Sequence, residues 1–149
     1  MANMLPPDFR DFLKLLNANE VEYLLIGGYA VTYHGYPRST YDMDIWIGIN
    51  EANATKMVKV MEGFGFSGEV SSSIFLSERC LLRMGVPPVR LEVLTSIDGV
   101  DFETCYQQRV VDVVDNVEIS IIGLTDLRTN KAASGRLKDL NDLENLPAS

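Results

Sequence analysis

Apolar residues recur at helical spacing in two segments of the N-terminal half of the chain. The segment 8–17 follows two prolines, and Asp8 stands where it can cap the first turn of a helix. The segment 51–64 has the same period and ends in glycines, which often terminate helices. Both patterns predict amphipathic helices. Their apolar positions are Phe9, Phe12, Leu13 and Leu16 in the first segment and Ala54, Met57, Val58 and Met61 in the second.

Two other segments of this half have the residue pattern of β-strands. Residues 21–26 form a continuous apolar, β-prone run that stops at Gly27 and Gly28, and a short helix is expected over 29–34. Residues 42–49 alternate, with apolar side chains on one face and two aspartates on the other. The order predicted here is strand, tight turn, short helix and half-buried strand.

The C-terminal half predicts further strands and helices. Gly85 and two prolines would join the first two strands, Asp115 and Asn116 would form the turn of a hairpin, and Thr125 would cap a helix. The whole chain, 1–149, is therefore expected to be a single α/β (α+β) domain with a mixed β-sheet flanked by helices. The strands are expected over 73–84, 89–95, 109–114 and 117–122, and the helices over 125–134 and 138–146.

Composition and charge restrict the class of protein. Hydrophobic residues make up 46% of the chain and charged residues 23%, which excludes a disordered or fibrous protein. The longest nearly apolar stretch, 23–31, is far shorter than the roughly 18 residues that span a bilayer, and the first residues lack the pattern of a secretory signal. We therefore expect a cytoplasmic protein with no membrane partner.

The net charge argues against one class of ligand. The chain carries 13 Lys and Arg against 21 Asp and Glu, a net charge of −8, so a broad basic face for long nucleic acid is not expected. Any polyanion has to be bound locally. The cations that cluster are Arg128, Lys131, Arg136 and Lys138.

Asp42 and Asp44 are the first candidates for chemistry, because Asp is depleted in strands and two of them here share one face. Like charges about 4 Å apart repel by roughly 4 kcal/mol at an effective dielectric near 20. A divalent cation relieves that repulsion, and Mg²⁺ favours one or two carboxylates together with water and phosphate oxygens. The alternative is a solvated pair at a strand edge, which caps backbone groups and pairs with Arg38.

Gly27 and Gly28 end one element and begin the next. Without side chains, they leave backbone N–H groups open at the positive end of a helix, which suits a bound phosphate. The alternative is an ordinary tight turn in which glycine accepts backbone angles that other residues avoid.

The combination of these two features is more specific than either. Gly27 and Gly28, thirteen intervening residues, and then Asp42 and Asp44 on the next strand resemble the signature of the nucleotidyltransferase superfamily. The resemblance implies the polymerase-beta-like nucleotidyltransferase fold. It extends from about residue 21 to residue 146.

Two further segments resemble a minimal bacterial branch of this superfamily that includes abortive-infection-type toxins. Arg38 and Thr40 stand in an Arg-x-Thr motif just ahead of the first aspartate. The segment 124–143 resembles a helix that contains a lysine, here Lys131, followed by Gly-Arg-x-Lys-Asp. The resemblance implies that Lys131 points to a triphosphate. On charge alone, the alternative is a solvated helix whose cations pair with Asp139, Asp142 and Glu144.

The superfamily places a third carboxylate on a later strand, and the resemblance implies that it is Glu92. The family usually has Asp there. Glu92 is one methylene longer and can still reach a metal ion or accept a proton from a hydroxyl group. The alternative is a strand residue that faces solvent and pairs with Arg90 or Lys59.

The resemblance therefore implies a Mg²⁺-dependent nucleotidyltransferase. Its catalytic residues would hold two Mg²⁺ ions and use a nucleoside triphosphate as substrate. The acceptor is an unidentified hydroxyl group of a protein, a tRNA end or a small molecule, and a cognate toxin or antitoxin is a candidate partner. The implied catalytic and metal-binding residues are Asp42, Asp44 and Glu92, and the implied nucleotide-binding residues are Gly27, Gly28, Arg38, Thr40 and Lys131.

A second function fits the same residues. Because Glu92 replaces the usual Asp and the chain is short, a catalytically weakened module that binds a nucleotide or a regulatory partner is the alternative.

Overall fold

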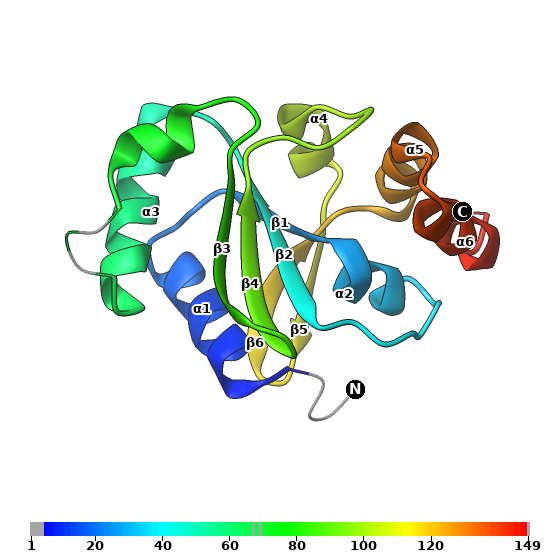
Figure 1. Ribbon diagram of the computed structural model, residues 1–149, viewed down its shortest axis with the longest axis horizontal. Helices are drawn as coiled ribbons and strands as arrows, with labels where there is room; N and C mark the ends of the chain where they lie inside the picture. Colours follow the sequence, from blue (N-terminus) through cyan, green and yellow to red (C-terminus); the bar gives the residue numbers. More distant parts are fainter. Residues whose placement is uncertain (1–4, 67, 69, 149) are drawn as a thin grey trace.

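In the computed structural model, residues 5–66, 68 and 70–148 are described, and six strands of this part form one mixed sheet (Figure 1). The strands lie in the order β3-β4-β2-β1-β6-β5. The pairs β2/β4 and β1/β6 are parallel, and the other neighbours are antiparallel. This confirms the predicted mixed sheet. The strands are β1 (Tyr23–Ile26), β2 (Asp42–Ile47), β3 (Leu81–Val86), β4 (Val89–Leu94), β5 (Val110–Val114) and β6 (Val117–Ile121).

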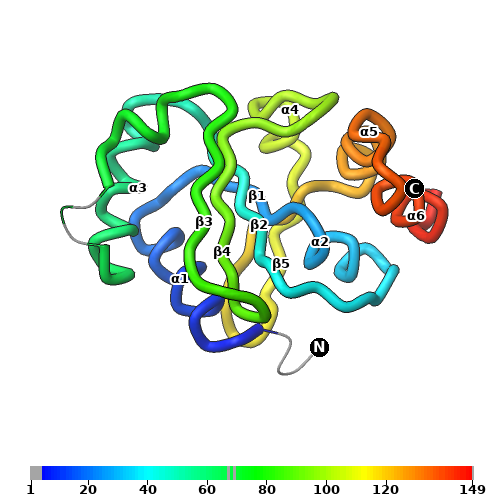
Figure 2. Tube along the Cα trace, in the orientation of Figure 1, coloured from blue at the N-terminus to red at the C-terminus, as the bar shows by residue number. Residues whose placement is uncertain are grey.

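Helices lie on both sides of the sheet. Helices α1 and α3 contact each other, and α1 packs on β4 and β6, whereas α2 follows β1 directly and contacts β1 and β2. Figures 1 and 2 show α5 and α6 packed together on the side away from α1 and α3. None of the described helices has the length and apolar character needed to cross a membrane. The helices are α1 (Pro7–Ala18), α2 (Gly27–Tyr33), α3 (Glu51–Gly63), the 3₁₀ helix η1 (Ser72–Leu76), α4 (Phe102–Gln107), α5 (Leu124–Ser134) and α6 (Leu137–Asn145).

The alternation of β2 separates the core from the functional face of the sheet. Met43, Ile45 and Ile47 are completely buried, as the sequence predicts. The side chains of Asp42 and Asp44 point to the opposite face, because successive residues of a strand do so. The functional residues of β2 are therefore held by the same strand that contributes to the centre of the core.

One predicted strand is wrong over its first half. The strand expected over 73–84 begins only at Leu81, and Ser72–Leu76 forms η1 instead. The side-chain oxygen of Ser71 accepts a hydrogen bond from the backbone N–H of Ser73 (3.2 Å). Local hydrogen bonds of this kind compete with strand pairing, so a serine-rich stretch turns before it extends.

The caps of two helices and the presence of a third helix also differ from the prediction. Asp8 lies in the first turn of α1 but does not cap it, and the cap position of α5 is Gly123 rather than Thr125. Helix α4 was not predicted. It is capped by Asp101, whose carboxylate accepts a hydrogen bond from the backbone N–H of Thr104 (3.1 Å).

Asn53 connects α3 to the ends of two central strands. Its side-chain oxygen accepts a hydrogen bond from the backbone N–H of Glu22 (2.8 Å). Its amide group donates to the backbone carbonyls of Glu22 (3.0 Å) and Gly48 (2.9 Å), and the residue is 2% exposed. These bonds satisfy backbone groups of Glu22, just before β1, and of Gly48, just after β2.

We predict that Asn53→Leu lowers the free energy of unfolding by about 2–3 kcal/mol, because three hydrogen bonds of a buried side chain are lost and the carbonyl group of Gly48 stays buried without a partner. Urea unfolding measures the change. The control is Asn145→Leu, because Asn145 is exposed and bonds only within its own helix. It should change stability by less than about 0.5 kcal/mol. Equal effects of the two substitutions would contradict the prediction.

Candidate functional site

A cleft of about 590 Å³ lies on the face of the sheet to which Asp42 and Asp44 point. Its walls come from the bend after β1, from β2, β3 and β4, and from α5 and the start of α6. Parts of the chain that are distant in sequence therefore meet here. All the residues predicted for the site line this cleft: Gly27, Gly28, Arg38, Thr40, Asp42, Asp44, Glu92 and Lys131.

The strand register brings the acidic residues together. In the parallel pair β2/β4, Asp42 lies opposite Arg90 and Asp44 lies opposite Glu92. In the antiparallel pair β3/β4, Glu92 lies opposite Arg83. Residues that lie opposite each other in adjacent strands share a face, so three carboxylates and two guanidinium groups occupy neighbouring positions in the cleft.

The two glycines are required by the close approach of neighbouring side chains. Gly27 has a φ of +68°, and a Cβ atom at this position would overlap the Asp44 carboxylate. A Cβ atom on Gly28 would lie 2.5 Å from Oγ1 of Thr40. The carboxylate of Asp44 therefore lies directly against the bend, in space that any other residue at position 27 would fill.

Asp44 is in the least favourable electrostatic position of the three carboxylates. Its Oδ1 atom is buried and has no hydrogen-bond partner among the described residues. Burial raises the pKa of Asp44 to about 7, and the charge of Glu92, a hydrogen bond with Glu92 and the charge of Asp42 act in the same direction. The charge of Lys138 partly offsets them. The positive charge near Asp44 is therefore too small to offset its burial and the neighbouring carboxylates.

The other two carboxylates are paired with arginines. The Arg90 guanidinium donates from Nε to Oδ1 of Asp42 and from Nη2 to Oδ2, each at 2.9 Å. Glu92 accepts from Nε of Arg83 (3.0 Å), and its Oε1 lies 3.5 Å from Nε of Arg90. Pairing of Glu92 with Arg90 is therefore seen, whereas Arg38 does not pair with Asp42.

A second group of charges joins α5, α6 and the loop before β2. Nζ of Lys131 lies 3.2 Å from Asp139 and 3.0 Å from Asp142. Arg38 donates two hydrogen bonds to Asp142, at 2.7 and 2.9 Å. Arg136 donates to Asp139 at 2.7 Å. The pairing of Lys131 with acidic residues matches the charge-only alternative, but the pairs are buried rather than solvated.

Lys138 is a cation that the resemblance places near the triphosphate without including it among the nucleotide-binding residues. It lines the cleft, and no carboxylate of the described residues forms an ion pair with it. Its charge acts on Asp44. The Gly-Arg-x-Lys-Asp motif contains it, but spacing alone does not distinguish which of the two cleft-lining lysines, Lys131 and Lys138, is held by aspartates.

The arrangement fits a divalent cation that brings part of its own coordination shell. Among the described residues, no three acidic, histidine or cysteine side chains enclose a metal site. Asp42 and Glu92 are turned toward arginines, so the three carboxylates are neighbours without forming a closed cage. Mg²⁺ needs only one or two carboxylates beside water and phosphate oxygens, and the oxygen of Asp44 that has no partner among the described residues is of the type such an ion takes as a ligand.

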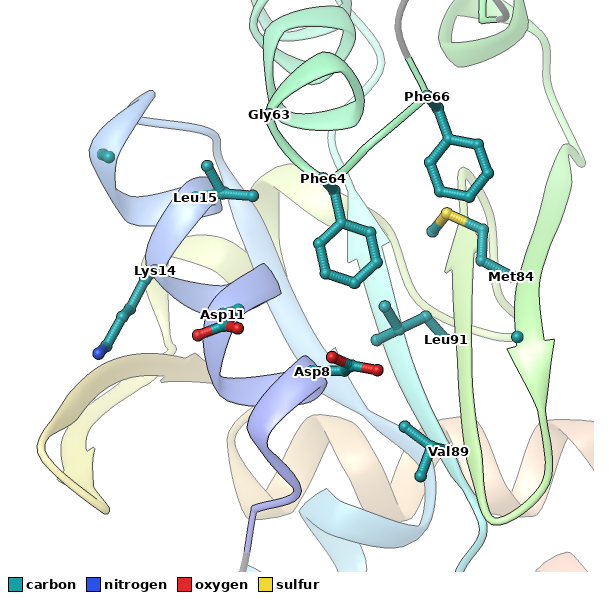
Figure 3. A pocket seen from close by; sticks show the side chains of 12 residues that line it. Asp8, Asp11, Lys14, Leu15, Gly63, Phe64, Phe66, Met84, Val89 and Leu91 are labelled. Atoms are coloured by element: carbon teal, nitrogen blue, oxygen red, sulfur yellow. The ribbon is translucent and has the colours of Figure 1, made fainter.

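A larger cavity lies on the other side of the β3–β4 hairpin (Figure 3). This groove of about 780 Å³ has an apolar floor, with Asp8 and Asp11 of α1 beside it. Met84 and Leu91 face the groove, whereas their strand neighbours Arg83 and Glu92 face the cleft. None of the residues predicted for the site lines the groove, so the smaller cavity is the candidate site. The apolar floor includes Leu15, Phe64, Phe66, Met84 and Leu91.

Comparison with solved structures identifies the architecture. The chain is similar to a protein from Thermotoga maritima whose assignment as a nucleotidyltransferase is provisional, with 16% identity, a TM-score of 0.63, and coverage of 95% of this chain and 93% of that chain. It is also similar to an antigenic nucleotidyltransferase-like protein from Paracoccidioides brasiliensis, with 19% identity, a TM-score of 0.53, and coverage of 89% and 70%. No protein-family model and no curated protein matches the sequence. At these identities the likeness concerns the fold.

We predict that Asp44→Asn stabilises the metal-free protein at pH 8. Between the ordinary pKa of 3.8 and the folded value of about 7, the folded state holds a proton that the unfolded chain has lost. Stability therefore falls as pH rises through this range and stays low above pH 7. Asn carries no charge, so the variant should be more stable by up to about 4 kcal/mol at pH 8 and similar to wild type near pH 4.

Urea unfolding in the presence of a chelator at both pH values measures this difference. Asp11→Asn is the control, because Asp11 is exposed on α1 and lies outside the cleft. An Asp44→Asn protein that is less stable than wild type at pH 8 would sink the prediction.

We predict that Gly27→Ala is destabilising by about 2–4 kcal/mol, because the new Cβ has to displace the Asp44 carboxylate and adopt a positive φ. The matched control is Gly68→Ala. Gly68 has a φ of +72° but no atom within 4 Å of the added Cβ, so this variant should show only the backbone cost of about 1 kcal/mol. Thermal and urea unfolding compare the two. Equal losses would show that the contact with Asp44 has no effect.

Proposed function

We propose that this chain, which has the nucleotidyltransferase fold, transfers a nucleoside monophosphate from a nucleoside triphosphate to a hydroxyl group in a Mg²⁺-dependent reaction. The observation that carries the proposal is the position of Asp42, Asp44 and Glu92 in one cleft beside the bend at Gly27 and Gly28. The buried, unpartnered oxygen of Asp44 supports it, because that carboxylate lacks a cation that the substrate complex would bring.

Each side chain then has a distinct role. Asp42 and Asp44 would hold the divalent cations, with Glu92 beside them, and bound Mg²⁺ would supply positive charge for the acceptor hydroxyl and the departing pyrophosphate. Glu92 is the residue that accepts the proton of the hydroxyl group. Open N–H groups at Gly27 and Gly28 orient a phosphate of the triphosphate.

The basic residues divide between binding and support. Lys131 is 4% exposed and ion-paired, so we assign it and Arg38 mainly to holding α6 at the cleft. Lys138 and Arg136, which line the cleft, are assigned to the phosphates. Thr40 Oγ1 donates to the backbone carbonyl of Asp42 (3.2 Å) and supports the start of β2 beside the nucleotide.

The proposed reaction requires only that the acceptor carry a hydroxyl group. A protein side chain, a tRNA end and a small molecule each offer one. These are the acceptors to be tested, and a toxin–antitoxin or phage-defence setting is part of the proposal through the sequence resemblance alone.

A second function is favoured by the arginines of the hairpin. Arg90 and Arg83 neutralise Asp42 and Glu92 in the metal-free protein. A chain that keeps these pairs when nucleotide binds would act as a nucleotide-dependent regulatory module without turnover. In that case Mg²⁺-ATP raises the melting temperature of the wild type but not that of Asp42→Asn, and no pyrophosphate is released.

We predict that the purified protein releases pyrophosphate from a triphosphate and transfers the α-phosphate label to one of the three acceptor classes when Mg²⁺ is present. Asp44→Asn should lower the rate by at least about 100-fold, because a ligand of the catalytic cations is removed. Labelled product is measured by chromatography and pyrophosphate by a coupled assay.

Glu118→Gln is the matched control, since Glu118 is an exposed carboxylate outside the cleft, and it should leave the rate unchanged. A chelator should abolish the activity. Equal rates for wild type and Asp44→Asn would defeat the proposal. Binding of Mg²⁺-ATP without pyrophosphate release would favour the regulatory module.

A further inference from the structure

The cleft face of β2, β4 and β3 carries alternating charges with one imbalance. Asp42 pairs with Arg90 and Glu92 pairs with Arg83, whereas no arginine of the hairpin pairs with Asp44. Three carboxylates therefore face two guanidinium groups, and one negative charge is left over. A divalent cation that entered the cleft alone would meet a weak net charge on these strands, the two arginines and the charge of Lys138.

Arg90 is the residue with which such a cation has to compete. It uses two donors on both oxygens of Asp42, at 2.9 Å each, and its Nε also lies 3.5 Å from Glu92. Both oxygens of a proposed metal ligand are thus taken by a positive group. By contrast, Arg83 donates its hydrogen bond to Glu92 and not to Asp42.

Arg90 is also able to release its partner. Its side chain is 29% exposed and that of Asp42 is 27% exposed, so the pair is open to the solvent of the cleft rather than locked in the core. A guanidinium group binds phosphate oxygens with the same two-donor geometry that it uses for a carboxylate. An arriving triphosphate can therefore replace Asp42 as the partner of Arg90.

We propose that Arg90 is the resident counterion of Asp42 and exchanges this carboxylate for a phosphate of the incoming nucleotide, so that the divalent cation and the triphosphate bind together. The inference rests on the proposed function. It adds an order to binding, because Asp42 becomes a metal ligand only when a phosphate replaces it as the hydrogen-bond partner of Arg90. The cation alone then binds weakly, and the metal–nucleotide complex is the form that the cleft accepts.

The test measures two affinities by titration calorimetry on wild type and Arg90→Gln, with Mn²⁺ alone and with a Mg²⁺-bound, non-hydrolysable ATP analogue. Loss of Arg90 should tighten Mn²⁺ binding on the order of tenfold, because its competitor is gone, and weaken the analogue on the order of tenfold. Tighter binding of Mn²⁺ together with weaker binding of the analogue is the result expected from the exchange. A merely structural role would weaken both ligands.

Two variants control the experiment. Arg90→Lys keeps the charge and should bind Mn²⁺ as weakly as wild type. Arg10→Gln removes an arginine from another ion pair, with Asp115 at 3.2 Å, which does not line the cleft, and should change neither affinity. If Arg90→Gln binds Mn²⁺ no more tightly than wild type, the inference is overturned while the proposed function stands. If no form binds either ligand, both are overturned.

A measurement on the wild type covers the case in which Arg90→Gln does not fold. The Nε–H signal of Arg90 in a nitrogen-15 NMR spectrum, assigned by its loss in Arg90→Lys, reports its partner. Millimolar Mg²⁺ alone should leave the signal in place, and Mg²⁺ with the analogue should shift it, while the Arg10 signal stays constant. A full shift with Mg²⁺ alone would overturn the inference.

Discussion

The constraint around which the site is arranged is a buried carboxylate oxygen of Asp44, which has no hydrogen-bond partner in the part of the chain that the structure describes. Asp44 lies against the bend after β1, and this position is open only because residue 27 has no Cβ atom. Burial together with the charges of Glu92 and Asp42 raises its pKa to about 7. The fold therefore holds a group in a state that costs stability, and such positions are typical of sites whose missing charge arrives with a ligand.

The neighbouring helices solve a similar problem in a different way. Helix α6 buries Asp139 and Asp142, each 1% exposed, and leaves Leu137 and Leu140 at 87% and 45%. This inversion of an amphipathic helix is tolerated because the buried aspartates are bound by Lys131 and two arginines. Ionic contacts thus attach α6 to the cleft where apolar packing would ordinarily do so. Because the aspartates of α6 pair with Lys131, Lys138 is left without an ion pair among the described residues.

Local patterns in the sequence predicted local structure well. The hairpin at Asp115 and Asn116 forms, with φ values of 54° and 65°, because Asp and Asn tolerate the left-handed region without glycine. The convergence of the acidic residues was anticipated through the resemblance. The pairing of Lys131 with Asp139 and Asp142 and that of Glu92 with Arg90 were anticipated only as alternatives. The pairing of Arg90 with Asp42 was not anticipated, because it depends on which strands become neighbours. Hydrophobic periodicity carries no information on such distant pairings, and it also fails where serines bend a segment, as in η1.

The core determines which of these charges meet. Met43 and Ile45 of β2 lie opposite Leu91 and Val93 of β4, and all four are buried. A shift of the register by one residue would turn one of these apolar sets toward the cleft, so packing strongly fixes the alignment. Once it is fixed, the residues between them follow: Asp42 has to face Arg90, and Asp44 has to face Glu92. The electrostatic pattern of the cleft is therefore a consequence of hydrophobic packing on the opposite face of the same two strands.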